Sequence, residues 1–236
     1  MNNPLYERTS LLCNNQGIEN LKNAKILVVG LGGVGGYAVE CLARSGIGNL
    51  VLVDGDTINA TNCNRQLISL QDNLGKYKSD EWVKRCYQIN SNGNFKSIPK
   101  YIRDESIKEL LSSSTFDYVI DAIDEVPAKI DLITYCIENK IPIISSMGAG
   151  GRLLSGDVQT CDISKTYGCP LAKAVRSNLK KHNIYKGVTA VFSPINNPVK
   201  RIPGTPVGSF APVVAIFGCR LAEYVLNKII IQNSII

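Results

Sequence analysis

Histidine is nearly missing from this chain of 236 residues, which contains only His182. We therefore expect neither a Ser-His-Asp triad nor a metal site made of several histidines, and we expect His182 to be solvated. The eight cysteines include no Cys-x-x-Cys pair. A zinc site with four thiolate ligands consequently has no support in the sequence, and we expect several cysteines to act as small hydrophobic residues.

The sequence also lacks a long uncharged hydrophobic run. The best candidate, Phe210–Cys219, is shorter than the roughly 20 apolar residues that a membrane span needs. Val213, Phe217 and Leu221 recur at helical spacing, so we predict a core helix here and no integral membrane segment. The residues after Met1 include Asn, Pro and Glu rather than an apolar leader. Together with the free thiols, this pattern predicts a cytoplasmic protein.

The sequence also lacks an unusually high or low content of hydrophobic or charged residues. Hydrophobic residues make up 44% and charged residues 19% of the sequence, which is typical of a globular protein. The length fits one large domain or a domain with a lobe. The formal net charge of +6 suits an anionic partner but does not identify one.

What the sequence does contain is a glycine-rich turn between two apolar runs. Residues 26–29 form the first run and 49–53 the second, which ends at Asp54. The turn has the order Gly-x-Gly-Gly-x-Gly, with glycines at Gly30, Gly32, Gly33 and Gly35. Three of them match a fingerprint in which glycines allow a tight turn, close approach to phosphate and close helix packing. A carboxylate at Asp54 can bind ribose hydroxyls, so the pattern predicts an adenine nucleotide but leaves NAD, FAD, SAM and ATP open.

Apolar runs alternate with helical patterns along most of the chain. We predict helices over 5–23, 75–89, 104–111, 127–139 and 171–181, besides those after the glycine turn and near the C-terminus. We predict strands over 26–29, 49–53, 95–102, 118–124 and 142–146, extended antiparallel structure over 152–163, and an irregular loop over 193–208. The predicted fold class is α/β, a Rossmann-like doubly wound, mainly parallel sheet with an antiparallel C-terminal extension. Ligands bind at the carboxyl edge of such sheets, where Gly30, Asp54, Asp124 and Gly148 are expected to meet.

Five short motifs follow one another in order: Gly30-x-Gly32-Gly33-x-Gly35, Asp54-x-Asp56, Asn62-x-x-Arg65-Gln66, Gly75-x-x-Lys78 and Asp121-x-x-Asp124. This order resembles the ubiquitin-activating-like superfamily, whose members adenylate carboxylates with ATP. Later segments are similar to one branch of it, the tRNA threonylcarbamoyladenosine dehydratases. They include Gly148-Ala149-Gly150, Cys169-Pro170-Leu171-Ala172, Val191-Phe192-Ser193 and Gly208-Ser209-Phe210. The resemblance implies one ThiF-type adenylation domain over 1–236, with a nucleotide half near 24–150 and a substrate and dimer lobe near 151–236.

The resemblance also implies roles for individual residues. ATP would be bound by the residues of the first five motifs, namely Gly30, Gly32, Gly33, Gly35, Asp54, Asp56, Asn62, Arg65, Lys78, Asp121 and Asp124. Asp54 would bind ribose, while Asn62 and Arg65 would contact phosphates and Lys78 would act there as a point charge. Asp124 would hold Mg²⁺, which prefers carboxylate and phosphate oxygens. Arg8 would reach across a homodimer as an arginine finger, so Arg8, Arg65, Lys78 and Asp124 are the expected catalytic residues.

Simpler alternatives stay open for several of these positions. Arg65 and Lys78 fit solvated surface groups, and Lys129 fits a plain helix-surface charge. Asp121 and Asp124 could terminate a strand, and Asp124 could cap the next helix. Cys169 fits either a thioester-forming nucleophile or a structural turn before proline.

The implied activity is ATP-dependent dehydration, or cyclisation, of threonylcarbamoyladenosine in the anticodon loop of tRNA. The implied partners are the modified tRNA and a second copy of the chain, and a cysteine desulfurase system stays open. One alternative is an adenylyltransferase for the C-terminus of a ubiquitin-like sulfur carrier. A second is an NAD-dependent oxidoreductase, which would leave Arg65, Lys78 and the Asp121–Asp124 pair unexplained. A third is a nucleotide-binding scaffold without catalysis.

A basic stripe is a candidate contact for tRNA. Lys173, Arg176, Lys180 and Lys181 share one face of a predicted helix, and Lys200 and Arg201 follow on the proline-rich loop. A solvated charged face is the equal alternative.

Overall fold

A seven-stranded sheet forms the centre of the protein in the computed structural model, which describes residues 4–194, 204–205 and 207–231. The strand order is β3-β2-β1-β4-β5-β7-β6. In that order the strands are Asn94–Ile98, Asn49–Val53, Lys25–Val29, Tyr118–Asp121, Ile143–Ser146, Thr189–Phe192 and Gln159–Asp162. Every neighbouring pair is parallel except β6 and β7. The predicted class, a doubly wound parallel sheet with an antiparallel C-terminal extension, is confirmed.

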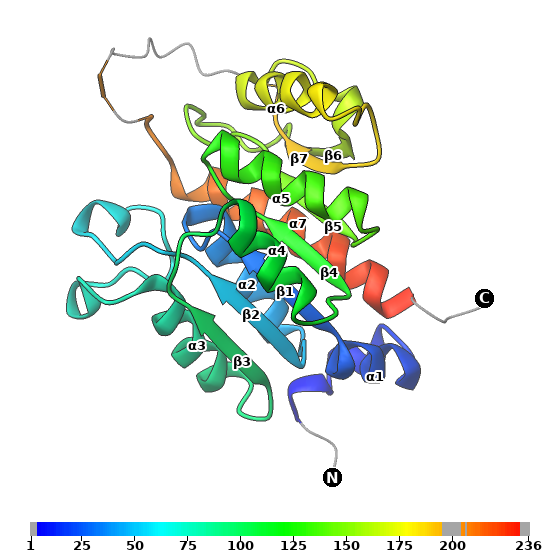
Figure 1. Ribbon diagram of the computed structural model, residues 1–236. Coiled ribbons are helices and arrows are strands. Elements are labelled where there is room, and N and C mark those ends of the chain that lie inside the picture. Colours follow the sequence, from blue (N-terminus) through cyan, green and yellow to red (C-terminus); the bar gives the residue numbers. More distant parts are fainter. Residues whose placement is uncertain (1–3, 195–203, 206, 232–236) are drawn as a thin grey trace.

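Helices cover both faces of the sheet (Figure 1). Helices α1 (Asn15–Asn23), α2 (Gly33–Arg44), α3 (Lys78–Ile89) and α7 (Ala211–Ile231) contribute to one hydrophobic core. Helices α4 (Asp104–Ser112), α5 (Val126–Glu138) and α6 (Pro170–Lys181) contribute to the other. The central strands are largely apolar and buried, and every residue of β4 is buried. This two-sided burial explains why these strands read as continuous apolar runs. The edge strands β3 and β6 are mostly polar and partly exposed.

The C-terminal helix α7 packs against α2 and lies behind the sheet in Figure 1. Val213, Phe217 and Leu221 are fully buried, as their helical spacing predicted. Among the described residues, no helix is long and apolar enough to cross a membrane.

Several predicted boundaries were wrong. Segment 5–23 contains the 3₁₀ turns η1 (Pro4–Tyr6) and η2 (Thr9–Leu11) before α1, because the side chain of Asn14 caps α1 by accepting a 2.8 Å hydrogen bond from the backbone N–H of Gly17. Helix α3 begins at Lys78, since Gly75 has a φ of +82°. Strand β3 ends before Pro99, β4 ends at Asp121, and β7 was not predicted. The predicted loop over 193–208, with Lys200 and Arg201, lies largely outside the described residues.

Candidate nucleotide-binding site

The glycine turn after β1 leaves no room for side chains at two positions. Gly30 has a φ of +86°, and a Cβ there would lie 2.6 Å from the carbonyl oxygen of Ala122. A Cβ on Gly35 would lie 1.8 Å from the carbonyl oxygen of Gly30. Because both atoms are backbone atoms, they cannot move aside as a side chain could. The turn is therefore packed directly against the segment that follows β4, as the close approach in a dinucleotide fingerprint requires.

Asp54 ties the glycine turn to the loop that follows β2. Its carboxylate accepts hydrogen bonds from the backbone N–H of Leu31 and from that of Asp56, each at 2.7 Å. Burial raises the pKa of Asp54, and the nearby Lys78 and the two backbone N–H groups offset only part of that rise. Each carboxylate oxygen keeps a further lone pair, so Asp54 can still accept hydrogen bonds from ribose hydroxyls.

A cavity of about 430 Å³ opens beside this loop, a size suited to a small ligand. Its lining is mostly polar and comes from the segment after β2, the start of α3 and the segment after β3. The lining residues are Gly55, Asp56, Thr57, Asn59, Asn62, Tyr77, Lys78 and Tyr101. Asp56, Asn62 and Lys78 were expected here, whereas Tyr101 and Asn59 were missed because no motif marks them.

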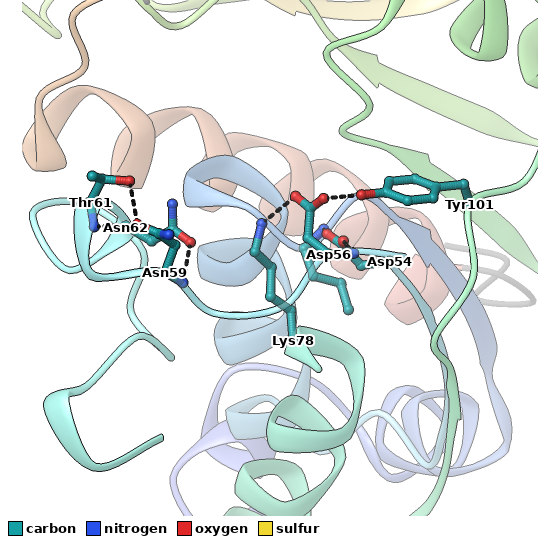
Figure 2. Close-up of polar contacts among 8 residues, drawn as sticks. Asp54, Asp56, Asn59, Thr61, Asn62, Lys78 and Tyr101 are labelled. Atoms are coloured by element: carbon teal, nitrogen blue, oxygen red, sulfur yellow. Dashed lines mark hydrogen bonds and ion pairs between the residues drawn. The ribbon is translucent and has the colours of Figure 1, made fainter. Parts of the chain in front are cut away.

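Lys78, Asp56 and Tyr101 form a chain of polar contacts inside the cavity (Figure 2). The ammonium of Lys78 lies 2.6 Å from Oδ2 of Asp56, and the hydroxyl of Tyr101 donates to Oδ1. Burial would raise the pKa of Asp56, but the hydrogen bonds from Lys78 and Tyr101 lower it below its usual value. The same contact with Asp56 raises the pKa of Tyr101 to about 12. Lys78 is only 4% exposed, so the alternative of a solvated surface lysine is wrong.

Asn62 and Arg65 belong to the turn around η3 (Ala60–Asn62). Oδ1 of Asn62 accepts a 3.0 Å hydrogen bond from the backbone N–H of Asn59, which closes the loop drawn in Figure 2. Arg65 is half-buried, and its Nη1 donates to the carbonyl of Thr61 at 3.0 Å and to Oδ1 of Asn64 at 2.8 Å. Its guanidinium is thus anchored to the loop that lines the cavity rather than freely solvated.

The two acids after β4 have different surroundings. Asp121 is fully buried, and its carboxylate contacts Lys129, Ser145 and the backbone N–H of Ile123. Asp124 is exposed, has no hydrogen-bond or ion-pair partner within the described part of the chain, and adds to the rise in the pKa of Tyr101. Asp124 does not cap α5, whose N-cap residue is Glu125.

Lys129 corrects an expectation from the sequence. It is 0% exposed, so the prediction of a plain helix-surface charge was wrong. The sequence did indicate that Lys129 is buried, because it shares the helical spacing of Leu132, Ile133 and Cys136, which are all buried. A lysine on an apolar stripe needs a buried carboxylate, and Asp121 supplies it.

Three residues that the sequence singled out lie apart from the cavity and from the segments that surround it. Arg8 precedes η2 and is exposed. Cys169 is 4% exposed at the start of α6, and its Sγ lies 3.7 Å from where a Cβ of Gly148 would be. This burial favours the structural alternative for Cys169 over a reactive nucleophile. His182 is exposed at the end of α6, as expected.

At the carboxyl edge of the sheet, the residues fit a Mg²⁺ ion only if a bound nucleotide supplies further oxygen ligands. The described residues contain no cluster of three potential metal ligands. An unpaired carboxylate at Asp124 nevertheless suits a Mg²⁺ ion whose other ligands are phosphate oxygens and water.

Comparisons with known proteins agree with this geometry. The model of the ThiF family matches residues 6–235. A Bacillus subtilis protein named tRNA threonylcarbamoyladenosine dehydratase is 41% identical over 188 residues, which cover 80% of this chain and 74% of that protein. Two crystal structures of the Escherichia coli tRNA N6-threonylcarbamoyladenosine dehydratase, TcdA, are similar at 35% identity. The complex with AMP has a TM-score of 0.90 and covers 95% of this chain and 93% of that chain. The complex with ATP has a TM-score of 0.89, with 96% and 94% covered.

Proposed function

The chain belongs to the ThiF family, and we propose that it catalyses the ATP-dependent dehydration of threonylcarbamoyladenosine in the anticodon loop of tRNA. One observation carries the proposal. The expected nucleotide residues Asp56, Asn62 and Lys78 line one polar cavity, in a fold that matches relatives described in complex with ATP and AMP. Asp54 adjoins this cavity, because its carboxylate accepts a hydrogen bond from the backbone N–H of Asp56. Those complexes also disfavour an NAD-dependent oxidoreductase, whose nucleotide would be a different one.

The reaction has two steps. An oxygen of the threonyl carboxylate attacks the α-phosphorus of ATP, the bond to the β-phosphate breaks, and pyrophosphate leaves. A group within the same modified base then attacks the activated acyl carbon, closes a ring and displaces AMP, which carries away the oxygen lost from the carboxylate. Because ring closure is intramolecular, correct orientation alone can drive it. No nucleophilic side chain is needed, which agrees with the burial of Cys169.

The residues in and around the cavity can supply what the first step needs. The backbone of the glycine turn accommodates phosphates, and Asp54 and Asp56 bind ribose. Lys78 and Arg65 stabilise the negative charge that develops when the carboxylate attacks, and Asn62 orients the phosphates. The contact between Lys78 and Asp56 keeps the ammonium inside the cavity before ATP arrives. Asp121 contributes indirectly by fixing the turn that presents Asp124.

The proposal extends to assembly and metal. Mg²⁺ bound by Asp124 and the phosphates would neutralise charge on the leaving pyrophosphate. We assign nucleotide binding to the half near 24–150 and substrate binding and dimerisation to the lobe near 151–236. In the homodimer, Arg8 of one protomer acts at the site of the other, and the enzyme works in the cytoplasm. A cysteine desulfurase system stays outside the proposal, because no described contact bears on it.

The direct test compares two tRNA samples, one without the modification and one bearing threonylcarbamoyladenosine. We expect AMP formation only with the second, together with the loss of one water from the modified nucleoside in mass spectrometry of digested tRNA. ATP consumption that is stimulated by a carrier protein with a Gly-Gly tail, and no change in the nucleoside, would favour the sulfur-carrier alternative. No ATP use with any substrate would contradict the proposal.

A further inference from the structure

The positive charge of the chain is concentrated in residues 163–187, which we call the basic strip. It contains Lys165, Lys173, Arg176, Lys180, Lys181 and Lys186 and no acidic residue. The whole chain has 26 Lys and Arg against 20 Asp and Glu, so outside the strip the two signs balance. The entire formal net charge of +6 therefore comes from this one segment.

The lysines of the strip also form no ion pair in the part of the chain that the structure describes, although Lys181 donates a 3.1 Å hydrogen bond to Oδ1 of Asn178. All five are exposed, and no carboxylate in the described ranges pairs with them. Elsewhere on the surface, Lys22, Lys84 and Lys108 each pair with a glutamate on the same helix. Arg176 differs from the lysines, because it is half-buried and donates to the hydroxyl of Thr166. Five exposed ammonium groups without a carboxylate partner, all within one segment, favour binding of a polyanion.

The strip lies at the end of the sheet that β7 and β6 form (Figure 1). Helix α6 starts at the carboxyl edge, where Cys169 lies beside Gly148. The segment after α6 reaches the amino edge, where the backbone N–H of Gly187 donates to Asp162 at the end of β6. The 12 residues of α6 span about 18 Å. Lys173, Lys180 and Lys181 thus form a line that leads away from the edge where the nucleotide binds.

Tyr167 provides an aromatic surface at the near end of this line. Its ring is 56% exposed and packs edge-on against Phe192, with 5.6 Å between the centroids. Its hydroxyl accepts a 3.2 Å hydrogen bond from Gln159, so the ring is fixed from two sides. Three strand spacings separate β7 from β1, about 14 Å. Tyr167 is therefore placed to stack on an unpaired base near the reacting one.

We propose that the basic strip binds the anticodon stem-loop of the tRNA, with the α6 lysines on stem phosphates and Tyr167 on an unpaired loop base. The proposal rests on the proposed function and adds where the tRNA lies. It also revises the stripe predicted from the sequence. Arg176 is engaged by Thr166, Lys165 and Lys186 join the surface, and Lys200 and Arg201 lie outside the described residues.

Charge reversal tests the phosphate contacts. In the double variant Lys180→Glu/Lys181→Glu we expect at least about tenfold weaker tRNA binding, with the slope of log K against log salt reduced by about two. The matched control is Lys84→Glu/Lys96→Glu, which changes the charge equally on α3 and β3 at the opposite edge. Binding is measured by fluorescence anisotropy over a range of salt concentrations. Equal losses in the two variants would overturn the proposal.

Stacking is tested separately. Tyr167→Ala should weaken tRNA binding about tenfold without changing the salt slope, because stacking releases no counterions. Tyr167→Phe keeps the ring and should bind as the wild type does. Wild-type affinity in Tyr167→Ala would remove the stacking contact.

Turnover separates this proposal from the proposed function. With modified tRNA and ATP, the charge-reversal variant should show a KM for tRNA raised about tenfold and kcat kept, since the nucleotide cavity is untouched. If the wild type removes no water from the nucleoside, the proposed function fails. If the wild type is active and the variant has an unchanged KM, only the tRNA surface is wrong.

Discussion

The ammonium of Lys129 and the carboxylate of Asp121 form an ion pair enclosed by protein, with Nζ 2.6 Å from Oδ2 and both side chains 0% exposed. Lys129 also donates to the carbonyl of Ser146 at 3.0 Å, which joins α5 to the ends of β4 and β5. Oδ1 of Asp121 accepts a 3.0 Å hydrogen bond from the backbone N–H of Ile123. The pair thereby fixes the segment that supports Gly30 on one side and presents Asp124 on the other.

Removing one partner of this pair should be costly. In Lys129→Met the carboxylate of Asp121 stays buried without a cation, and we expect the free energy of unfolding to fall by about 3–5 kcal/mol. Urea denaturation measures the change. The double variant Lys129→Met/Asp121→Asn leaves no uncompensated charge and should lose less than the single one. Lys108→Met, in an exposed pair, is the control. A single variant as stable as its control would contradict the assigned role.

The sequence predicted the strands and helices of the fold better than the polar contacts that join them. Strands β1 and β2 are apolar after their first residues, Lys25 and Asn49, so their burial follows from composition alone. Strand β7 was missed because it is only four residues long and follows a run of exposed residues. Lys129 was misread because a charge usually marks a solvated face, and only the nearness of Asp121 in space makes its burial favourable. Tyr101 was missed for the same reason, since its contact with Asp56 joins segments that are distant in the sequence.

Acid should weaken the contact between α2 and α3 through Glu40. Arg85 donates to both carboxylate oxygens of Glu40, at 2.6 and 2.8 Å. Burial would raise the pKa of Glu40, but the hydrogen bonds from Arg85 and Arg44 lower it below its usual value. A lowered pKa in the folded state contributes stability above the unfolded pKa, and that stability is lost as the pH falls through the folded pKa. Glu40→Gln should thus cost about 2 kcal/mol at neutral pH and flatten the decline of stability in acid.

Urea unfolding between neutral pH and acid checks the Glu40 prediction. Arg85→Met should flatten the same decline, because the pKa of Glu40 would return toward its usual value. An acid decline in Glu40→Gln as steep as that of the wild type would contradict the assignment.

Lys78 should matter for the first chemical step. Lys78→Met removes the ammonium from the cavity, and we expect kcat for AMP formation to fall about 100-fold. Lys78→Arg keeps the charge but not the compact geometry and should recover only part of the activity. The matched control is Lys76→Met, an exposed residue outside the cavity. Wild-type kcat in Lys78→Met would remove this residue from the proposed mechanism.

Asp124 should determine the requirement for Mg²⁺. Asp124→Asn keeps the shape of the side chain but removes its charge, so we expect the Mg²⁺ concentration for half-maximal activity to rise about tenfold or more. Calorimetry of ATP binding with and without Mg²⁺ gives a readout independent of turnover. An unchanged Mg²⁺ requirement would place the ion elsewhere.

Arg8 offers a test of the dimer, because an exposed residue outside the cavity can act only if a partner brings it to a site. Arg8→Ala should lower kcat at least about 100-fold. Heterodimers of an Arg8→Ala protomer and a Lys78→Met protomer can be isolated with two different tags. If Arg8 acts across the dimer, one site of this heterodimer is intact, and about half the wild-type activity should return.

The mirror-image heterodimer joins a wild-type protomer to one carrying both substitutions. It should be nearly inactive, because its only complete cavity faces the substituted Arg8. Activity in the second heterodimer and none in the first would show that Arg8 serves its own protomer. Failure to recover any doubly tagged species would contradict the dimer itself.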